Sequence, residues 1–250
     1  PAPWRRRTSP PTGGITTAAG SLRSQPSGEP PAMTDPAGAD QVAERLAAVR
    51  ERIAAQGVDP SVLEVVAVTK FHDAASCRAA VAAGLTTLGE NRVQEALGKM
   101  DAVSGATWHL IGHLQTNKAR LAGRFALVQS LDSMRLADAL AVRAPEVPVL
   151  LEVNVSGDQE KSGVEVGEAL ALAEHAAGRL QLHGVMGMGP REGDPRPAFR
   201  RLRELKERVE DRLGRRLPVL SMGMSGDFEI AVQEGSTMLR LGTVLFGSRD

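Results

Sequence analysis

Residues 63–70 read Leu63-Glu64-Val65-Val66-Ala67-Val68-Thr69-Lys70, and this short apolar run that ends in a lysine decides the fold class. Its length and its β-branched residues predict a strand. Four consecutive apolar residues leave no polar face for solvent, so we expect the strand to be covered on both sides, as in parallel sheets. The run Val149-Leu150-Leu151 has the same character farther along the chain.

Strand-like and helical segments alternate from this point to the end of the chain. The eight predicted strands are Leu63–Lys70, Thr86–Asn91, Thr107–His113, Ala126–Ser133, Pro148–Val155, Leu180–Gly189, Pro218–Met224 and Met238–Gly247. The predicted helices are Ala74–Ala83, Arg92–Asp101, Met134–Arg143, Glu165–Gly178, Pro197–Leu213 and Phe228–Glu234. Such units pair their strands in parallel through right-handed crossovers, and eight of them close into a barrel. We therefore predict an α/β protein with a single (β/α)8 barrel.

An open doubly wound sheet is the alternative fold. It would show a glycine fingerprint after its first strand, whereas this turn reads Thr69-Lys70-Phe71-His72.

The chain divides into a tail and a barrel domain. Residues 1–36 are rich in Pro, Gly and Ser, so we predict a disordered tail, and residues 37–250 form the predicted barrel. The first methionine is Met33, and we expect the residues before it to be a disordered extension or to reflect the choice of start site. From Asp40, apolar residues at helical spacing predict an amphipathic helix before the first strand.

Composition excludes several classes of partner. Lys plus Arg and Asp plus Glu both number 30, so bulk charge favours neither nucleic acid nor an anionic membrane. No apolar run is long enough to span a bilayer. The single cysteine, Cys77, rules out a disulfide framework and favours a reducing, cytoplasmic compartment. His109 and His113 would lie roughly 13 Å apart on a strand, which disfavours a shared metal.

Lys70 is the first candidate for chemistry, because it ends the first strand. A lysine there either extends into solvent or points into the barrel mouth. Active sites of such barrels lie at the carboxyl ends of the strands, which favours the second reading. A partly desolvated lysine has a lowered pKa and becomes a nucleophilic amine, suited to forming a Schiff base.

The last two strands supply a candidate anion site. The segment Ser221–Asp227 follows the seventh strand, and Gly235–Thr243 runs into the eighth. Glycines beside hydroxyl groups let backbone N–H groups approach a phosphate, and these two loops form the usual phosphate site of such barrels. Tight barrel packing is the alternative reason for the glycines. Arg240 stands inside an apolar strand and therefore needs a fixed partner.

Taken together, these residues resemble the pyridoxal phosphate homeostasis proteins of the YggS/PROSC type, which are related to the alanine racemase N-terminal barrel. The resemblance runs from about residue 37 to the end. It is carried by Val66–Lys70, Gly89–Glu95, Trp108–Lys118, Ser221–Asp227 and Gly235–Gly247. Where that family usually has an aromatic residue after Glu-Asn, this chain has Arg92.

The resemblance implies that the cofactor is pyridoxal 5'-phosphate. It implies that Lys70 is the Schiff-base lysine and that Arg240 is the partner of the pyridine nitrogen. Ser225, Gly242 and Thr243 would contact the phosphate. Asn91 and His113 are placed at the mouth by position alone, and Met224 is assigned to the same site. No residue is assigned to catalysis or to a metal.

The remaining question is whether the protein is a carrier or an enzyme. A guanidinium only donates, so Arg240 would keep the pyridine nitrogen unprotonated and the ring a weak electron sink. Two-base racemases on this barrel resemble one another in using a tyrosine opposite the lysine, and this chain has none. It also ends at Asp250, which leaves no room for the second β domain of such enzymes.

We therefore expect a carrier without robust turnover. It would buffer pyridoxal phosphate in the cell and deliver it to apoenzymes, as a monomer or weak dimer, with no nucleic-acid or membrane partner. The alternative is a pyridoxal-phosphate-dependent amino-acid racemase or lyase.

Overall fold

The computed structural model of the chain describes residues 38–158 and 162–247. The predicted tail, 1–36, lies outside these ranges, as do residue 37 and residues 248–250 of the predicted barrel domain. The prediction of a disordered tail therefore stays a prediction.

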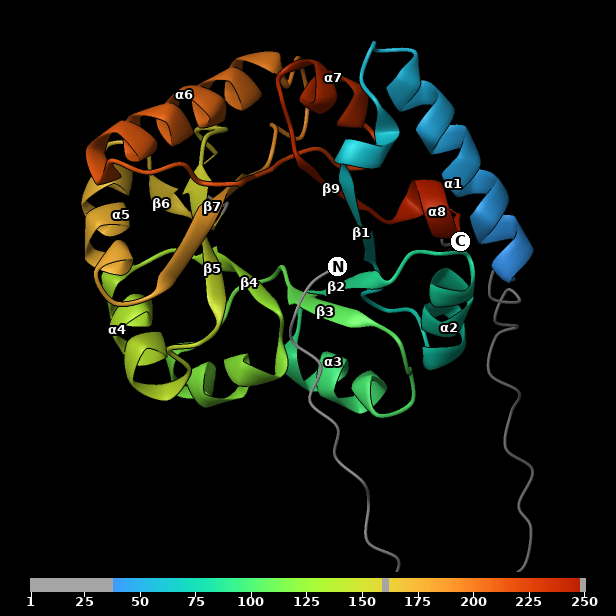
Figure 1. Cartoon of the computed structure of the whole chain (residues 1–250), viewed down its shortest axis with the longest axis horizontal. Helices are drawn as coiled ribbons and strands as arrows, with labels where there is room; N and C mark the ends of the chain where they lie inside the picture. Colours follow the sequence, from blue (N-terminus) through green and yellow to red (C-terminus); the bar gives the residue numbers. More distant parts are fainter. Residues whose placement is uncertain (1–37, 159–161, 248–250) are drawn as a thin grey trace, which may run out of the picture. The chain divides into compact units, whose positions relative to one another are not determined.

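Eight parallel strands close into a barrel, as predicted (Figure 1). Their order around the ring is β1-β2-β3-β4-β5-β7-β8-β9, with β1 hydrogen-bonded to β9 and β4 to β5. The two-residue strand β6 pairs outside the ring with β5. The bounds are β1 Glu64–Val68, β2 Thr87–Glu90, β3 Thr107–Leu110, β4 Leu127–Leu131, β5 Pro148–Asn154, β6 Val164–Glu165, β7 Gln181–Gly187, β8 Val219–Ser221 and β9 Met238–Leu241.

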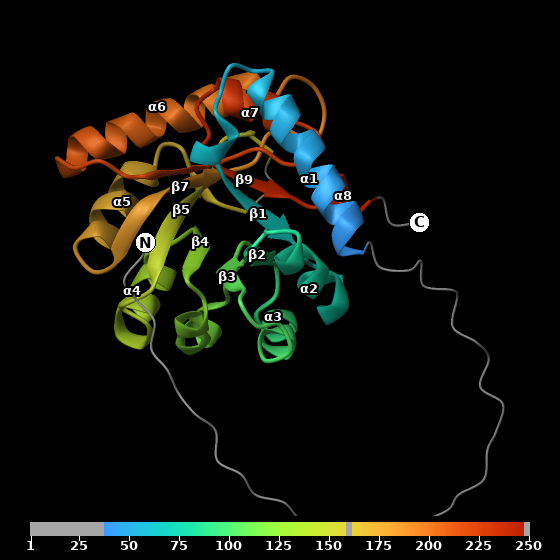
Figure 2. The same cartoon turned by 45° about the vertical axis from the view of Figure 1, so that its right-hand side comes forward.

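Helices surround the barrel on its outside (Figure 1). They are α1 Ala39–Ala54, α2 Ala74–Ala82, α3 Val93–Met100, α4 Met134–Arg143, α5 Ala169–Ala177, α6 Arg196–Leu213, α7 Phe228–Gln233 and α8 Thr243–Phe246, with 3-10 helices η1 Pro60–Val62 and η2 Thr116–Arg124. Helices α1 and α8 lie side by side, joined by a hydrogen bond from Arg45 Nη1 to the Leu245 carbonyl (Figure 2). Across the described ranges, no helix has both the length and the apolar character needed to cross a membrane.

Local sequence signals explain where several helices begin and end. The Asp73 carboxylate accepts from the Ser76 N–H at 2.8 Å and caps α2, and Ser133 caps α4 in the same way. Gly214 ends α6 in the left-handed conformation, with φ of 64°, which a glycine adopts without a steric penalty. The amphipathic first helix is confirmed, since Val42, Leu46, Val49 and Ile53 are all buried.

The core has two parts. The larger lies between the barrel wall and the helices, and a small apolar cluster lies separately from it: Val66, Leu127, Leu150, Met186 and Met238. Side chains alternate along a strand, so the residues two positions from these face the same way. Glu152 on β5, Gln129 on β4 and Arg240 on β9 thereby share the barrel interior, and all three are buried.

The predicted eighth strand, Met238–Gly247, is wrong in its second half. Strand β9 ends at Leu241, the backbone of Gly242 leaves the extended conformation with φ of −121° and ψ of −84°, and α8 follows. The run Thr-Val-Leu-Phe is too short for its periodicity to separate helix from strand.

Other boundaries also differ from the predictions. The helix predicted to begin at Glu165 begins at Ala169, because Glu165 belongs to β6. Neither β6 nor η2 was predicted, since both are too short or irregular to show a clear hydrophobic period. The first strand ends at Val68, so Lys70 lies in the loop after it.

Candidate functional site

The eight predicted site residues all lie at or just beyond the carboxyl ends of strands. Because the strands are parallel, these ends share one rim of the barrel. The residues are Lys70 after β1, Asn91 after β2, His113 after β3, Met224 and Ser225 after β8, Arg240 within β9, and Gly242 and Thr243 after β9. The topology therefore brings residues from distant parts of the chain to one mouth.

Ser225 and the start of α8 form a small cradle of polar groups. The Ser225 hydroxyl accepts hydrogen bonds from the N–H groups of Gly242 and Val244, each at 3.2 Å. Backbone N–H groups that converge on one oxygen are the arrangement that binds phosphate in many proteins. Thr243, between the two donors, is exposed and accessible. The loops after β8 and β9 thus meet, as the sequence predicted. The helix α8, which presents the N–H donors, was not predicted.

The loop that carries Ser225 requires a glycine at its start. Gly223 has φ of 97°, and a Cβ there would lie 2.6 Å from the Ala231 Cβ. The next N–H, of Met224, donates to Asp227 Oδ1 at 2.6 Å. These constraints hold the Ser225 hydroxyl toward α8, while the Met224 side chain stays exposed.

Arg240 is buried in the barrel mouth and held at both ends of its guanidinium. Nη1 donates to Ser221 Oγ at 2.6 Å, and Nη2 donates to the Gly187 carbonyl at 2.9 Å. Burial lowers the pKa of Arg240 to about 10, while the carboxylates of Glu152 and Asp227 oppose that shift. The guanidinium therefore remains charged at neutral pH, and the fixed partner that its burial demanded is present.

A chain of polar side chains continues from Arg240 through the barrel. Ser221 Oγ donates to Gln129 Oε1 at 2.7 Å, and Gln129 Nε2 lies 3.2 Å from His109 Nδ1. Desolvation lowers the pKa of His109 to about 4, so the ring is neutral and its Nδ1 accepts. Sequence reasoning missed Ser221 as the partner of Arg240 and Gln129 as the partner of Ser221, although a polar residue inside an apolar strand was the signal that could have found them.

Replacing His109 by asparagine is expected to make stability less sensitive to acid. Asparagine keeps an acceptor near the Nδ1 position but has no proton to gain. The wild-type histidine titrates near 6.5 when unfolded and near 4 when folded, so the unfolded state binds more protons between these values. Its stabilisation is complete above 6.5 and is lost as the pH falls toward 4, by about 3 kcal/mol.

The free energy of unfolding of wild type and of His109→Asn is measured by urea denaturation at neutral pH and at pH near 4, and the loss between the two pH values is compared. His175→Asn is the matched control, because His175 pairs with Asp138 at the surface. Equal acid sensitivity of wild type and His109→Asn would contradict a neutral, buried ring.

Glu152 is a buried carboxyl group that sequence reasoning did not single out. One oxygen, Oε1, accepts from Ser162 Oγ, and Oε2 has no hydrogen-bond partner within the described residues. Burial raises the pKa of Glu152, and Asp132 adds to the effect, while Arg240 and His113 oppose it. Strand β5 is four strands from β1 in either direction, so Glu152 faces the Lys70 side across the barrel. An unsatisfied buried oxygen suits a site that receives a polar ligand.

Asn91 and His113 lie on neighbouring loops at the rim. The loops approach so closely that a Cβ on Gly112 would lie 2.4 Å from the Asn91 carbonyl oxygen, which requires a glycine there. His113 Nδ1 lies 2.9 Å from Asp132 Oδ2, and the His113 side chain is 57% exposed. Asn91 is half-buried. Their assignment to a ligand remains a prediction.

The fold and the site define a class of protein: a (β/α)8 barrel with a lysine after its first strand and backbone donors beyond its last. The family model described as the N-terminal domain of alanine racemase matches residues 39–250. A pyridoxal phosphate homeostasis protein of Pseudomonas aeruginosa is 42% identical over 224 residues, which cover 85% of this chain and 96% of that relative. The chain belongs to the pyridoxal phosphate homeostasis protein family, as its motifs predicted.

Solved structures agree with this assignment. PipY of Synechococcus elongatus, with pyridoxal phosphate bound, superposes with a TM-score of 0.72 at 34% identity and covers 82% of this chain and 100% of that one. Alanine racemase of Corynebacterium glutamicum superposes with a TM-score of 0.69 at 15% identity, covering 83% of this chain and 61% of that one. At that identity the likeness shows the shared fold alone.

Proposed function

We propose that this protein binds pyridoxal 5'-phosphate as a Schiff base on Lys70 and serves in its intracellular homeostasis. The cofactor supplies an aldehyde for the lysine and a ring that withdraws electrons. The observation that carries the proposal is the placement of Lys70 and the Ser225 cradle at the same mouth, after the neighbouring strands β1 and β9. Membership of the family supports the choice of ligand.

The residues present fit this ligand in two respects. The N–H groups of Gly242 and Val244 already converge on an oxygen atom, so they are directed for a phosphate oxygen, with Ser225 and Thr243 supplying hydroxyls beside them. Inside the mouth, Glu152 Oε2 has no partner among the residues described, and a polar ring substituent would satisfy it. Asn91, His113 and Met224 complete the rim.

Arg240 would face the pyridine nitrogen. The guanidinium is held by Ser221 and Gly187, keeps its charge at neutral pH and has only donors to offer. A donor at that atom keeps the nitrogen unprotonated. The charge that develops at the substrate Cα in amino-acid chemistry would then be weakly stabilised, which favours holding the cofactor over turnover.

We further propose a carrier that works in the cytoplasm as a monomer or weak dimer and gives its cofactor to apoenzymes. An amino-acid racemase or lyase is the second candidate, because the barrel is that of alanine racemase. Against this second candidate, the sequence contains no tyrosine that could act as the base on the face of the substrate opposite Lys70. General acid–base catalysis needs such a group within hydrogen-bond reach of the Cα proton.

The loaded protein is expected to transfer its cofactor to an apo-transaminase without turning over amino acids. Two measurements on the same preparation check this: recovery of transaminase activity, and deuterium incorporation at Cα across a panel of amino acids. If Cα deuterium exchange occurs at an enzymatic rate and Lys70→Ala abolishes it, the protein is a racemase or lyase and the carrier proposal is wrong. Transfer no faster than the release of free cofactor would leave storage as the function.

A further inference from the structure

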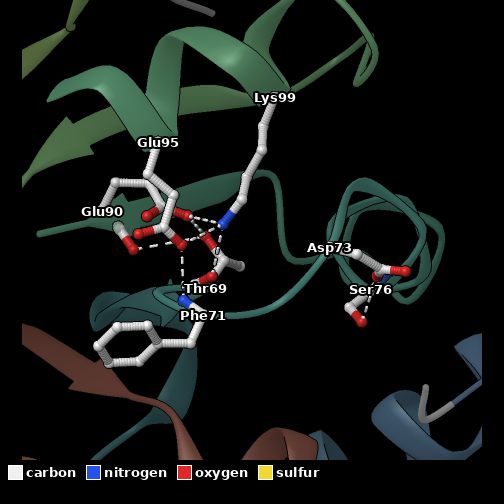
Figure 3. Close-up of polar contacts among 8 residues, drawn as sticks. Thr69, Phe71, Asp73, Ser76, Glu90, Glu95 and Lys99 are labelled. Carbon is white, nitrogen blue, oxygen red and sulfur yellow. Dashed lines mark hydrogen bonds and ion pairs between the residues drawn. The ribbon is translucent and has the colours of Figure 1, made fainter. Parts of the chain in front are cut away.

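The two residues that flank Lys70 are both tied to one polar cluster behind the barrel wall (Figure 3). The Thr69 carbonyl accepts from Lys99 Nζ at 2.9 Å, and the Phe71 N–H donates to Glu95 Oε1 at 2.6 Å. The first contact holds the peptide group before Lys70, and the second holds the peptide group after it. Because peptide groups are rigid planes, holding both restricts φ and ψ of Lys70 and hence the direction of its side chain.

The cluster itself is built from β2 and α3. Lys99 Nζ lies 2.8 Å from Glu90 Oε1 and 2.8 Å from Glu95 Oε1, and Glu90 Oε1 also accepts from the Thr69 hydroxyl at 2.5 Å. Glu95 and Lys99 are one helical turn apart on α3, so they project from the same face. Glu90 is the last residue of β2 and is fully buried.

The electrostatics favour a firm contact to the Lys70 loop. Burial raises the pKa of Glu95, but hydrogen bonds from Lys99 and from the Phe71 N–H outweigh it and hold that pKa below its usual value. Glu95 is therefore ionised at neutral pH, and a carboxylate accepts from an N–H more strongly than a neutral group does.

Phe71 shows that this contact holds a conformation the chain would otherwise avoid. Its φ is 65°, and among the described residues no other non-glycine residue has a positive φ. A left-handed backbone is disfavoured for a residue with a Cβ, and such strain persists only where surrounding contacts impose it. The Glu95 contact to the Phe71 N–H is one of those contacts. The chain therefore changes direction at Phe71, directly after Lys70, and the Glu95 contact helps to hold that turn.

We propose that Glu90, Glu95 and Lys99 are positioning residues that fix the Lys70 backbone and thereby set how readily its amine condenses with an aldehyde, forming a C=N bond and releasing the carbonyl oxygen as water. The inference rests on the proposed function of Lys70. An ordinary ion-pair cluster would stabilise the fold without distinguishing between ligands. A positioning cluster affects the covalent bond more than the contacts to the ring and phosphate.

The test compares two ligands on the full-length protein. Pyridoxal 5'-phosphate can bond to Lys70, whereas pyridoxine 5'-phosphate has the same ring and phosphate but no aldehyde. Glu95→Ala removes the acceptor of the Phe71 N–H and leaves the pair of Glu90 and Lys99 in place. Loss of one hydrogen bond to a charged group is expected to lower the affinity for pyridoxal phosphate about tenfold. Affinity for pyridoxine phosphate is expected to change by less than about twofold.

Two further variants refine the comparison. Gln94→Ala is the matched control, because Gln94 lies beside Glu95 on α3 and its side chain accepts from Lys118 instead. Its affinities should equal those of wild type. Glu95→Gln keeps an oxygen that can accept from the Phe71 N–H, so it should restore most of the pyridoxal phosphate affinity and of the visible absorbance of the covalent form.

The outcomes separate the inference from the proposed function. Equal losses for both ligands in Glu95→Ala would show a structural role and overturn the inference, and so would no loss for either. A wild-type protein that bound both ligands equally and formed no bond that borohydride reduces would overturn the proposed function of Lys70 and, with it, the inference.

Discussion

Replacing Lys70 by alanine is expected to abolish the covalent bond between the protein and pyridoxal phosphate. Lys70 is half-buried directly beyond β1, at the same mouth as the Ser225 cradle. The variant keeps the backbone N–H donors of Gly242 and Val244. Some cofactor should still bind through its phosphate, but affinity should fall about a hundredfold, the equivalent of roughly 3 kcal/mol.

Borohydride reduction followed by tryptic mapping identifies the bonded lysine. In wild type the reduced adduct should lie on the peptide that contains Lys70, and Lys70→Ala should yield none. Lys118→Ala is a suitable control, because Lys118 is also at the mouth side of β3 but donates to Gln94. An adduct on another lysine of the wild-type protein would refute the assignment.

Replacing Arg240 by leucine is expected to be the most destabilising single change at the site. The Gly187 carbonyl would lose its donor, Ser221 would lose a charged partner, and Glu152 would lose the positive charge that opposes its protonation. Breaking hydrogen bonds to a buried charge costs about 3 kcal/mol in the free energy of unfolding. The size of this effect means that stability must be measured before any change in cofactor binding is interpreted.

Urea denaturation of the cofactor-free protein measures the effect. Arg124→Leu is the matched control, since Arg124 is 53% exposed and its partner Asp101 is 89% exposed. That change should alter the free energy of unfolding by less than about 1 kcal/mol. Comparable losses in both variants would contradict a special structural role for Arg240.

The sequence by itself determined the architecture of the barrel. Apolar strands such as Val65–Val68 and Val149–Leu151 bury all their side chains only when both faces of the sheet are covered. Because such strands alternate with amphipathic helices, few topologies other than a closed parallel ring are compatible with the sequence. The same alternation placed Lys70, Ser225 and Arg240 at strand ends or within strands. Because parallel strands end on one rim, local patterns were enough to predict that these residues share a mouth.

The contacts that give those residues their properties were decided only by the tertiary structure. Ser221, Gln129 and His109 are far from Arg240 or from one another along the chain, and only closure of the barrel makes them one hydrogen-bonded series. The helix α8 depends on packing against α1, since the run Thr243–Phe246 has no period of its own.

The same holds for the cluster around Lys70. Glu95 and Lys99 are predictable as helical neighbours, but their contacts to Thr69 and Phe71 arise because β2 pairs beside β1 and α3 packs against β2. Sequence periodicity specifies which face of an element is buried. It does not specify which polar atoms meet across elements, because a hydrogen bond is sensitive to differences of a few tenths of an ångström in the donor–acceptor distance, and packing of the whole barrel sets that distance.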